Sequence, residues 1–509
     1  MKKSLKKPLV FALALLLAFP VTFSLTGCGD RTNVLKVYNW GEYIADGSDG
    51  SADIIKDFEA WYEELTGDPI RVEYSLFDTN ETMYTQISNK HADYDVVCPS
   101  DYTVQKMMTN DMLLPVNDAD FAEIWAATFA DEDPEDYGLA ADEEITLKNI
   151  MNPGLTELLT VYDKGWGEED DLVYSVPYMW GTFGLLYDDA KINKLGGAAE
   201  DMQSWEALFG DKFAGHIYMK NSVRDAYASA NIYNATAELS ALSDGFTNYG
   251  EAYADLLAQC MNHPNSDTIS SAEATLKKQK KNLFAYESDE GKEDLMNGKS
   301  SAALGFVWSC DAGYVIGQEE NTELWYSVPV EGTNVWVDNW CIPKYAGNKT
   351  AAQYFIAYCS TYAAAYENMY WVGAATPVTQ AAADIADEIR NPRDLFAADY
   401  LEENEGATEA DAFAEWSALV ADAGDENSAT SSESYDALAE YVYFLDKYLE
   451  TADVCENSAE CACPWHAYAE MYAQCLFPSD EQVGRAAIMT DFAEKNTDIV
   501  RMFTRVKAA

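Results

Sequence analysis

Three consecutive segments decide the fold: LKVYNWGEYI (residues 35–44), SADIIKDFEAWYEELTG (51–67) and IRVEYSLF (70–77). The first and third carry apolar residues in the pattern of β-strands, and the middle one has them at helical spacing before a stop at Gly67. A strand, a helix and a strand in this order form a βαβ unit, which predicts a mainly parallel sheet covered by helices.

The same alternation continues along the chain. YDVVCPSDYTVQKMMTNDMLLPV (94–116) indicates a strand, a turn and a helix, and similar patterns begin again near residues 172, 215, 300 and 335. Removing the first 27 of 509 residues leaves 482, which at about 150 residues per domain suggests two or three domains. We therefore expect two α/β lobes.

Three segments interrupt this pattern. Residues 130–144 and 167–171 are acidic and loop-like, and a block at about 387–474 is rich in Ala, Asp and Glu. This block contains AGDENSATSSES (423–434), which has the composition of a flexible linker. We interpret all three as surface insertions.

The N-terminus predicts export. MKKSLKK is positively charged, and residues 8–23 form an apolar stretch too short for a membrane-spanning helix. The following SLTGC (24–28) resembles the lipobox of bacterial lipoproteins, in which residues 1–27 would be a signal peptide and Cys28 the site of lipid attachment. We therefore expect a lipid-anchored protein on the outer face of the cytoplasmic membrane or in the periplasmic space.

The charge balance narrows the classes of partner. The chain has 33 Lys and Arg residues against 87 Asp and Glu residues, a formal net charge of −54. This argues against binding to nucleic acid or to anionic lipid through a basic face. It is compatible with a cationic ligand, although surface acid serves mostly solubility.

Nine cysteines remain besides Cys28. Disulfides form outside the cytoplasm, and an odd number of cysteines leaves at least one thiol free. Cys98, Cys341 and Cys359 lie in apolar segments and are predicted to be buried thiols. CENSAECACPWH (455–466) offers three thiols and an imidazole, but its spacing matches no zinc signature, so one or two local disulfides are favoured. No metal or cofactor is predicted.

The end of the first strand has an unusual set of side chains. Trp40, Glu42 and Tyr43 stand within four residues of one another where the strand stops. Aromatic faces and carboxylates are the groups that hold an alkylammonium ion, through cation–π contact and charge pairing. The segment is therefore a candidate part of a cation-binding site.

Eight motifs together resemble a known family. They resemble, in the same order, the spermidine/putrescine-binding proteins of ABC importers: VYNWGEYI, DTNETMY, YDVVCPSDYTV, SVPYMWGTFGLLYD, SWEALF, GFVWSCDAG, VWVDNWCIPKYAGN and TP at 376–377. The resemblance implies a two-lobed α/β fold like that of periplasmic binding proteins, with a hinge and a ligand cleft between the lobes. Residues 28–186 with 339–382 would form the first lobe, and residues 187–338 with 383–509 the second, which would include the acidic insertion at about 387–474.

The resemblance also implies a function. The chain would capture a polyamine outside the membrane and deliver it to the permease of an ABC transporter. Ten residues match positions that line the family's ligand site: Trp40, Glu42, Tyr43, Ser100, Tyr102, Asp225, Trp308, Asp311, Trp336 and Asp338.

Some of the matched positions bear on the choice of polyamine. Asp311 matches an Asp of putrescine-binding members, whereas Ser222 and Ala374 replace an Asp and a Tyr of spermidine-binding members. Gly41 replaces a hydroxyl residue of the family. Putrescine is therefore favoured over spermidine.

Three alternatives stay open, the weakest of which is a surface adhesion or scaffold role for the acidic block near the C-terminus. An enzyme is disfavoured, because the chain shows no Ser–His–Asp arrangement, phosphate loop or zinc signature, and its four histidines share no motif. A binding protein for another small organic cation or an amino acid is the second alternative. An amino acid usually requires an Arg for its carboxylate, and the matched positions offer only Arg224.

Overall fold

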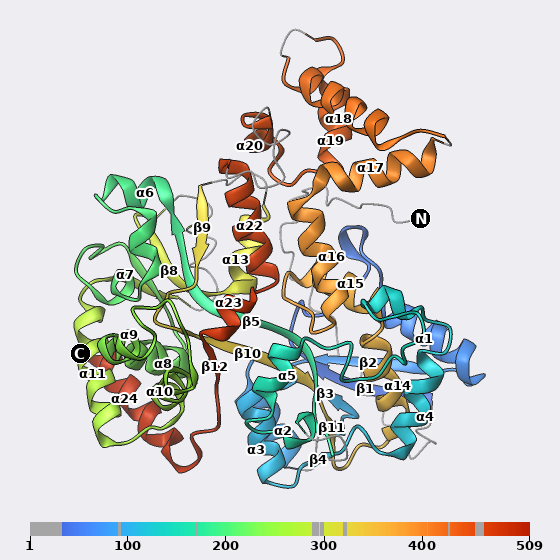
Figure 1. The fold of residues 1–509 in the computed structure, drawn as a ribbon. Coiled ribbons are helices and arrows are strands. Elements are labelled where there is room, and N and C mark those ends of the chain that lie inside the picture. The colour runs from blue at the N-terminus through green and yellow to red at the C-terminus, as the bar shows by residue number, and fades with distance from the viewer. Residues whose placement is uncertain are drawn as a thin grey trace, which may run out of the picture.

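The computed structural model describes residues 33–89, 93–167, 172–287, 295, 300–318, 323–404, 406–425, 428–452 and 463–509. The predicted signal peptide and Cys28 lie outside these residues. Figure 1 shows two bodies of helices and strands on either side of the strands β5 and β10.

The first lobe is built on the predicted βαβ unit. The strands β1 (Val34–Asn39), β2 (Arg71–Leu76) and β3 (Val96–Val97) form a parallel sheet in the order β2-β1-β3. Helix α1 (Ile54–Thr66) connects β1 to β2 and ends at Gly67, whose φ of 78° is accessible to glycine at little cost. A short pair, β4 (Leu113–Leu114) with β11 (Ile342–Pro343), extends this lobe.

The second lobe contains a seven-stranded sheet in the order β12-β10-β5-β8-β6-β7, with β9 also paired to β5. It is mixed rather than mainly parallel, because β5 runs antiparallel to its neighbours β8, β9 and β10. The sheet is made from β5 (Val176–Asp188), β6 (Ile217–Lys220), β7 (Leu283–Glu287), β8 (Leu304–Trp308), β9 (Leu324–Ser327), β10 (Thr333–Trp340) and β12 (Ala486–Ile488).

The long strand β5 contributes to the cores of both lobes. Its residues up to Trp180 pack in the core of the first lobe, Phe183, Leu185 and Tyr187 pack in the core of the second, and Leu186 packs in another core. Strand β10 lies antiparallel beside it and adds Val335 and Val337 to the first core. The two strands therefore pass directly from one lobe to the other.

Helices cover both sheets. Besides α1, those before β10 include α2 (Asn80–Ser88), α3 (Asp101–Thr109), α4 (Ala119–Thr128), α5 (Pro153–Leu159), α6 (Asp189–Lys194), α7 (Glu206–Phe209), α8 (Val223–Asn234), α9 (Thr236–Leu242), α10 (Glu251–Asn262), α11 (Ser266–Lys280) and α13 (Ser309–Ile316). Those after β10 include α14 (Lys349–Cys359), α15 (Tyr362–Val372), α16 (Thr379–Arg390), α23 (Asp480–Gly484) and α24 (Asn496–Ala508).

The described residues of the acidic block at 387–474 form a packed helical unit, and part of the segment with linker composition, residues 431–434, lies in a helix. Its helices bury Trp416 and Trp465 in a third hydrophobic core, and Trp465 donates a 2.9 Å hydrogen bond to the carbonyl of Tyr443. Figure 1 shows its first helices projecting from the body of the protein. After α16 the unit consists of α17 (Pro392–Glu403), α18 (Glu409–Ala423), α19 (Ser431–Ala439), α20 (Leu445–Leu449) and α22 (Pro464–Leu476).

The structure confirms the three cysteines predicted to be buried. Cys98, Cys341 and Cys359 are buried free thiols, as predicted. Cys463 is also buried, with its Sγ 3.2 Å from Nδ1 of His466, whereas Cys455 and Cys461 lie outside the described residues. Within the described part of the chain, no cluster of three or more His, Cys, Asp or Glu residues is arranged to hold a metal ion. The helices of that part also lack the length and apolarity needed to cross a membrane.

Candidate ligand-binding site between the lobes

The carboxylate of Asp338 is the centre of a hydrogen-bonded group. The hydroxyl of Ser100 donates to its Oδ1 at 2.6 Å, and the hydroxyl of Tyr43 donates to its Oδ2 at 2.8 Å. Asp338 is 8% exposed, and this burial raises its pKa to about 6, although the two hydrogen bonds oppose the rise. Three residues predicted from distant segments therefore meet at one carboxylate.

Asn80 supports this group and was not predicted from the sequence. Its Nδ2 donates to the hydroxyls of Ser100 at 2.9 Å and Tyr102 at 3.0 Å, and its Oδ1 accepts from the backbone N–H of Ser100 at 3.1 Å. Asn80 begins α2 and is only 4% exposed. A buried Asn with three such bonds fixes the orientation of Ser100 toward Asp338. Its place within the motif DTNETMY was the signal that could have identified it.

The segment after β1 places Trp40 at the edge of the same region. The indole N–H of Trp40 donates to the carbonyl of Cys98 at 2.9 Å, and its ring centroid lies 4.4 Å from that of Phe77. Trp40 is half-buried, which leaves part of its ring accessible. Glu42 is exposed and has a φ of 52°, a conformation that few residues other than glycine adopt.

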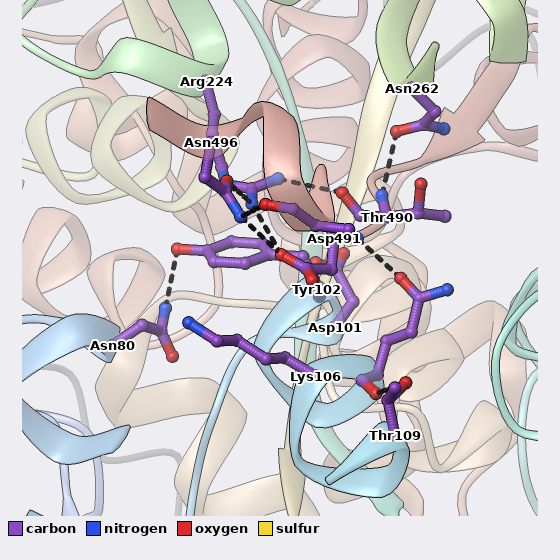
Figure 2. Close-up of polar contacts among 12 residues, drawn as sticks. Asn80, Asp101, Tyr102, Lys106, Thr109, Arg224, Asn262, Thr490, Asp491 and Asn496 are labelled. Carbon is purple, nitrogen blue, oxygen red and sulfur yellow. Dashed lines mark hydrogen bonds and ion pairs between the residues drawn. The ribbon is translucent and has the colours of Figure 1, made fainter. Parts of the chain in front are cut away.

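Tyr102 lies between the lobes in this structure. The guanidinium carbon of Arg224, on α8 of the second lobe, is 3.9 Å from the centroid of its ring. Arg224 also donates to the carbonyl of Thr490 at 2.9 Å and to Oδ1 of Asn496 at 3.0 Å, and it lies 3.6 Å from a carboxylate oxygen of Asp491. Figure 2 shows this interlobe contact, with Tyr102 lying between Arg224 and Asn80.

A second charged group lies at the end of β8. The ring of Trp308, the last residue of β8, lies under the ammonium of Lys220, whose Nζ is 4.1 Å from the ring centroid. The same Nζ is 2.9 Å from Oδ2 of Asp311 and 3.6 Å from Oε1 of Glu287. These three charged residues are buried, with exposed fractions of 2% for Lys220 and 7% for each acid.

Asp225 belongs to this second group. It stands in the first turn of α8 and is 6% exposed. Burial raises its pKa, and hydrogen bonds from Ser222 and Trp308 and the charge of Lys220 oppose the rise. The sequence predicts Asp225, Trp308 and Asp311 as site residues but not Lys220. A single lysine at the end of an apolar strand does not indicate which side chains it contacts.

The strand register places Asp338 and two tryptophans on one face of the sheet. Opposite β5, Asp338 pairs with Met179, Trp336 with Gly181 and Trp308 with Phe183. Alternate residues of a strand point to the same face, and directly paired residues of antiparallel strands share it. Asp338, Trp336 and Trp308 therefore form a row along one face.

Gly181 allows this row to form. A Cβ at Gly181 would lie 2.4 Å from Oγ of Ser309 and 2.6 Å from Cζ2 of Trp336. The ring of Trp336 therefore lies directly over the backbone of β5, and its indole N–H donates to the carbonyl of Thr182 at 3.1 Å. In the register of the strands, Trp336 stands between Asp338 and Trp308.

Comparison with solved structures places the fold among two-lobed binding proteins of ABC transporters. The chain superposes on a spermidine/putrescine ABC transporter substrate-binding protein from Streptococcus pneumoniae, with 19% identity, a TM-score of 0.53 and coverage of 94% of this chain and 99% of that chain. A putative spermidine/putrescine ABC transporter from Listeria monocytogenes gives 20% identity, a TM-score of 0.54 and coverage of 93% and 99%. The predicted fold class is confirmed.

The sequence comparison identifies the family. Residues 53–399 match the family described as bacterial extracellular solute-binding protein, and the chain belongs to this family, whose members bind solutes rather than catalyse reactions. The spermidine/putrescine-binding periplasmic protein of Escherichia coli (strain K12) is 24% identical over 368 residues, which cover 72% of this chain and 84% of that protein. A putrescine-binding periplasmic protein of the same organism is 24% identical over 331 residues, covering 64% and 72%.

Proposed function

We propose that this protein is the substrate-binding component of an ABC importer, which captures a polyamine outside the membrane and delivers it to the permease. The observation that carries the proposal is the buried carboxylate of Asp338, in one row with Trp336 and Trp308. The relatives named for spermidine and putrescine support the same class of ligand.

The chemistry of the row suits an alkylammonium chain. Transferring an ammonium ion out of water is costly unless a carboxylate pairs with it, and an indole face adds cation–π attraction. With a pKa of about 6, Asp338 is mostly ionised at neutral pH and can supply that charge. The indoles of Trp336 and Trp308 then offer apolar surface to the methylene groups.

Within the polyamines, we assign the site to a short diamine, with putrescine preferred over spermidine. One ammonium would pair with Asp338 and the other with a carboxylate of the Trp308 group. Asp311 bonds to Lys220, so we assign the second ammonium to Asp225. The positions at which spermidine-binding members carry additional groups are otherwise engaged, since Ser222 caps α8 and Ala374 is buried.

The contacts of Arg224 disfavour an amino acid as the ligand. Its guanidinium already bonds to Thr490 and Asn496 and stacks on Tyr102. A ligand carboxylate would have to displace these partners. Another small organic cation is the second candidate, because the same carboxylate and indoles would hold it.

Calorimetric titration of the mature protein with putrescine and spermidine tests the proposal, and thermal unfolding provides an independent measurement. A ligand that binds only the folded state adds about 2.7 kcal/mol of stability at a concentration 100 times its Kd. We expect one-to-one binding of putrescine and a higher Tm. A protein that neither polyamine binds nor stabilises would overturn the proposal, and binding of a choline-like cation instead would favour the second candidate.

We also propose that Cys28 carries the lipid anchor. The motif SLTGC supports this, together with the charged and apolar segments that precede it. A Cys28→Ser variant should lose labelling by a radioactive fatty acid and leave the membrane fraction. If this variant stays in the membrane fraction, the anchor lies elsewhere.

A further inference from the structure

Lys220 holds its ammonium in an arrangement that resembles the binding of an amine ligand. Its Nζ lies 4.1 Å from the centroid of the Trp308 ring and 2.9 Å from Oδ2 of Asp311. An indole face and a carboxylate are the two groups that a polyamine-binding site requires for each ammonium. The side chain of lysine is itself a four-carbon chain that ends in an ammonium, which is one end of a 1,4-diamine.

The order of strands shows where this ammonium lies relative to the row of ligand-binding candidates. Across the sheet, β10 carries Asp338 and Trp336, β8 carries Trp308, β6 carries Lys220 and β7 carries Glu287, with β5 between β10 and β8. Lys220 therefore lies on the far side of Trp308 from Asp338. A ligand that extends from Asp338 past Trp336 to Trp308 would meet Lys220 next.

The burial of Lys220 shows that its charge is compensated by the fold. Only 2% of the residue is exposed, and a buried ammonium is stable only when it is paired. Asp311 and Glu287 approach from two different elements, α13 and β7. The ammonium is thus held from two sides and over an indole, which fixes its position at the end of the row.

We infer that Lys220 is a specificity-determining residue, whose ammonium occupies the place of a further ligand ammonium and restricts the cleft to short diamines. This inference rests on the proposed polyamine function. The third ammonium of spermidine would approach a fixed positive charge, and like charges brought together in a binding site lower the affinity. It would also find Asp311 already paired.

The test compares the selectivity of three variants with that of the wild type. Lys220→Met keeps a side chain of similar length without the charge. In Lys220→Met/Asp311→Asn, the buried pair is removed together, so that Asp311 is not left as an uncompensated charge if the single variant fails to fold. Lys194→Met removes an exposed lysine of the same lobe and is the matched control.

The measured quantity is the ratio of the Kd values of spermidine and putrescine, obtained by calorimetric competition at constant ionic strength. In wild type and Lys194→Met we expect putrescine to bind more tightly. In Lys220→Met the ratio should fall by at least about tenfold, because repulsion is lost and Asp311 can pair with the third ammonium. In the double variant it should fall less, because only the repulsion is lost.

The outcomes distinguish a failure of the proposed polyamine function from a failure of the role assigned to Lys220. If wild type and all variants bind neither polyamine, the proposed function fails. If polyamines bind but the ratio is the same in wild type and in each folded Lys220 variant, the role of Lys220 is overturned while the proposed function stands. A wild type that prefers spermidine would likewise overturn the role of Lys220.

Discussion

The hydroxyl of Tyr43 donates a 2.8 Å hydrogen bond to Oδ2 of Asp338, a residue 295 positions further along the chain. Tyr43 follows the first strand of the first lobe, and Asp338 lies on β10, one of the two strands that pass between the lobes. The bond therefore joins the loop after β1 to a connecting strand. Together with Ser100, it holds a buried carboxylate in one orientation before any ligand arrives.

Asp338→Asn should weaken polyamine binding and stabilise the unliganded protein. Removing the charge leaves a ligand ammonium unpaired, which costs about 2–5 kcal/mol of binding free energy. Conversely, the raised pKa means that an ionised Asp338 costs stability above pH 6, so the neutral amide should raise the free energy of unfolding at pH 7 by up to about 3 kcal/mol.

Titration calorimetry and urea unfolding measure the two effects of this substitution. Asp68→Asn, at an exposed position, is the control and should change neither. Wild-type affinity of Asp338→Asn for polyamine would show that Asp338 does not bind the ligand. Wild-type stability of this variant at pH 7 would show that ionisation of the buried Asp338 does not destabilise the folded protein.

Polyamine affinity should decrease in acid with a midpoint near pH 6. In the unliganded protein the pKa of Asp338 is about 6, and only the ionised carboxylate pairs with an ammonium. Protonation between pH 7 and pH 5 should therefore weaken binding by about tenfold, since the ionised fraction falls by that factor. Polyamines stay fully protonated over this range, so the change belongs to the protein.

The pH dependence of stability has the opposite sign. The folded protein binds the proton of Asp338 more tightly than the unfolded chain does, so this residue makes unliganded protein less stable as the pH rises from 4 to 6. Asp338→Asn should remove the contribution of this residue to both dependences. Calorimetry and unfolding from pH 4.5 to 7.5 measure them, and an affinity that is constant over this interval would contradict the assignment of Asp338 to the ligand.

Tyr43→Phe should raise the pKa of Asp338 further and weaken binding at pH 7. The hydroxyl of Tyr43 stabilises the ionised carboxylate, and a hydrogen bond to a charged group contributes about 1.5–3 kcal/mol. The midpoint of the pH dependence of affinity should therefore move above its wild-type value. Tyr345→Phe, at a residue that is 62% exposed, should leave the midpoint unchanged. A midpoint equal in both variants would show that Tyr43 does not tune Asp338.

The sequence predicts local structure better than it predicts contacts between distant residues. The βαβ unit follows from the periodicity of residues 35–77, and the buried thiols follow from their apolar surroundings. Which residues meet in the site depends on strand register, and a single sequence does not encode that in its periodicity. Tyr43, Ser100 and Asp338 could be grouped only through the family resemblance, and Asn80 and Lys220 were not found.

The acidic block shows a second limit of prediction from sequence, which is that composition alone can conceal a helical pattern. Its high content of Ala, Asp and Glu concealed a helical pattern in which Ala412, Trp416 and Val420 recur every fourth residue and are buried. Composition describes the exposed faces of such helices, which carry most of the residues. The buried stripe is narrow, so it is visible only when the spacing of the few large apolar residues is followed.

Gly181→Ala should displace Trp336 and reduce both stability and ligand affinity. The added Cβ would lie 2.6 Å from Cζ2 of Trp336 and 2.4 Å from Oγ of Ser309, closer than real side-chain contacts. Overpacking of this kind typically costs about 1–3 kcal/mol of folding free energy. Because Trp336 lies between Asp338 and Trp308 in the row, its shift should weaken putrescine binding beyond any loss of folded protein.

Gly484→Ala, which has open space around the new Cβ, is the matched control and should bind putrescine with wild-type affinity. Urea unfolding and calorimetry of both variants measure the effects. If Gly181→Ala binds putrescine as wild type does, the ring of Trp336 is not a part of the ligand site.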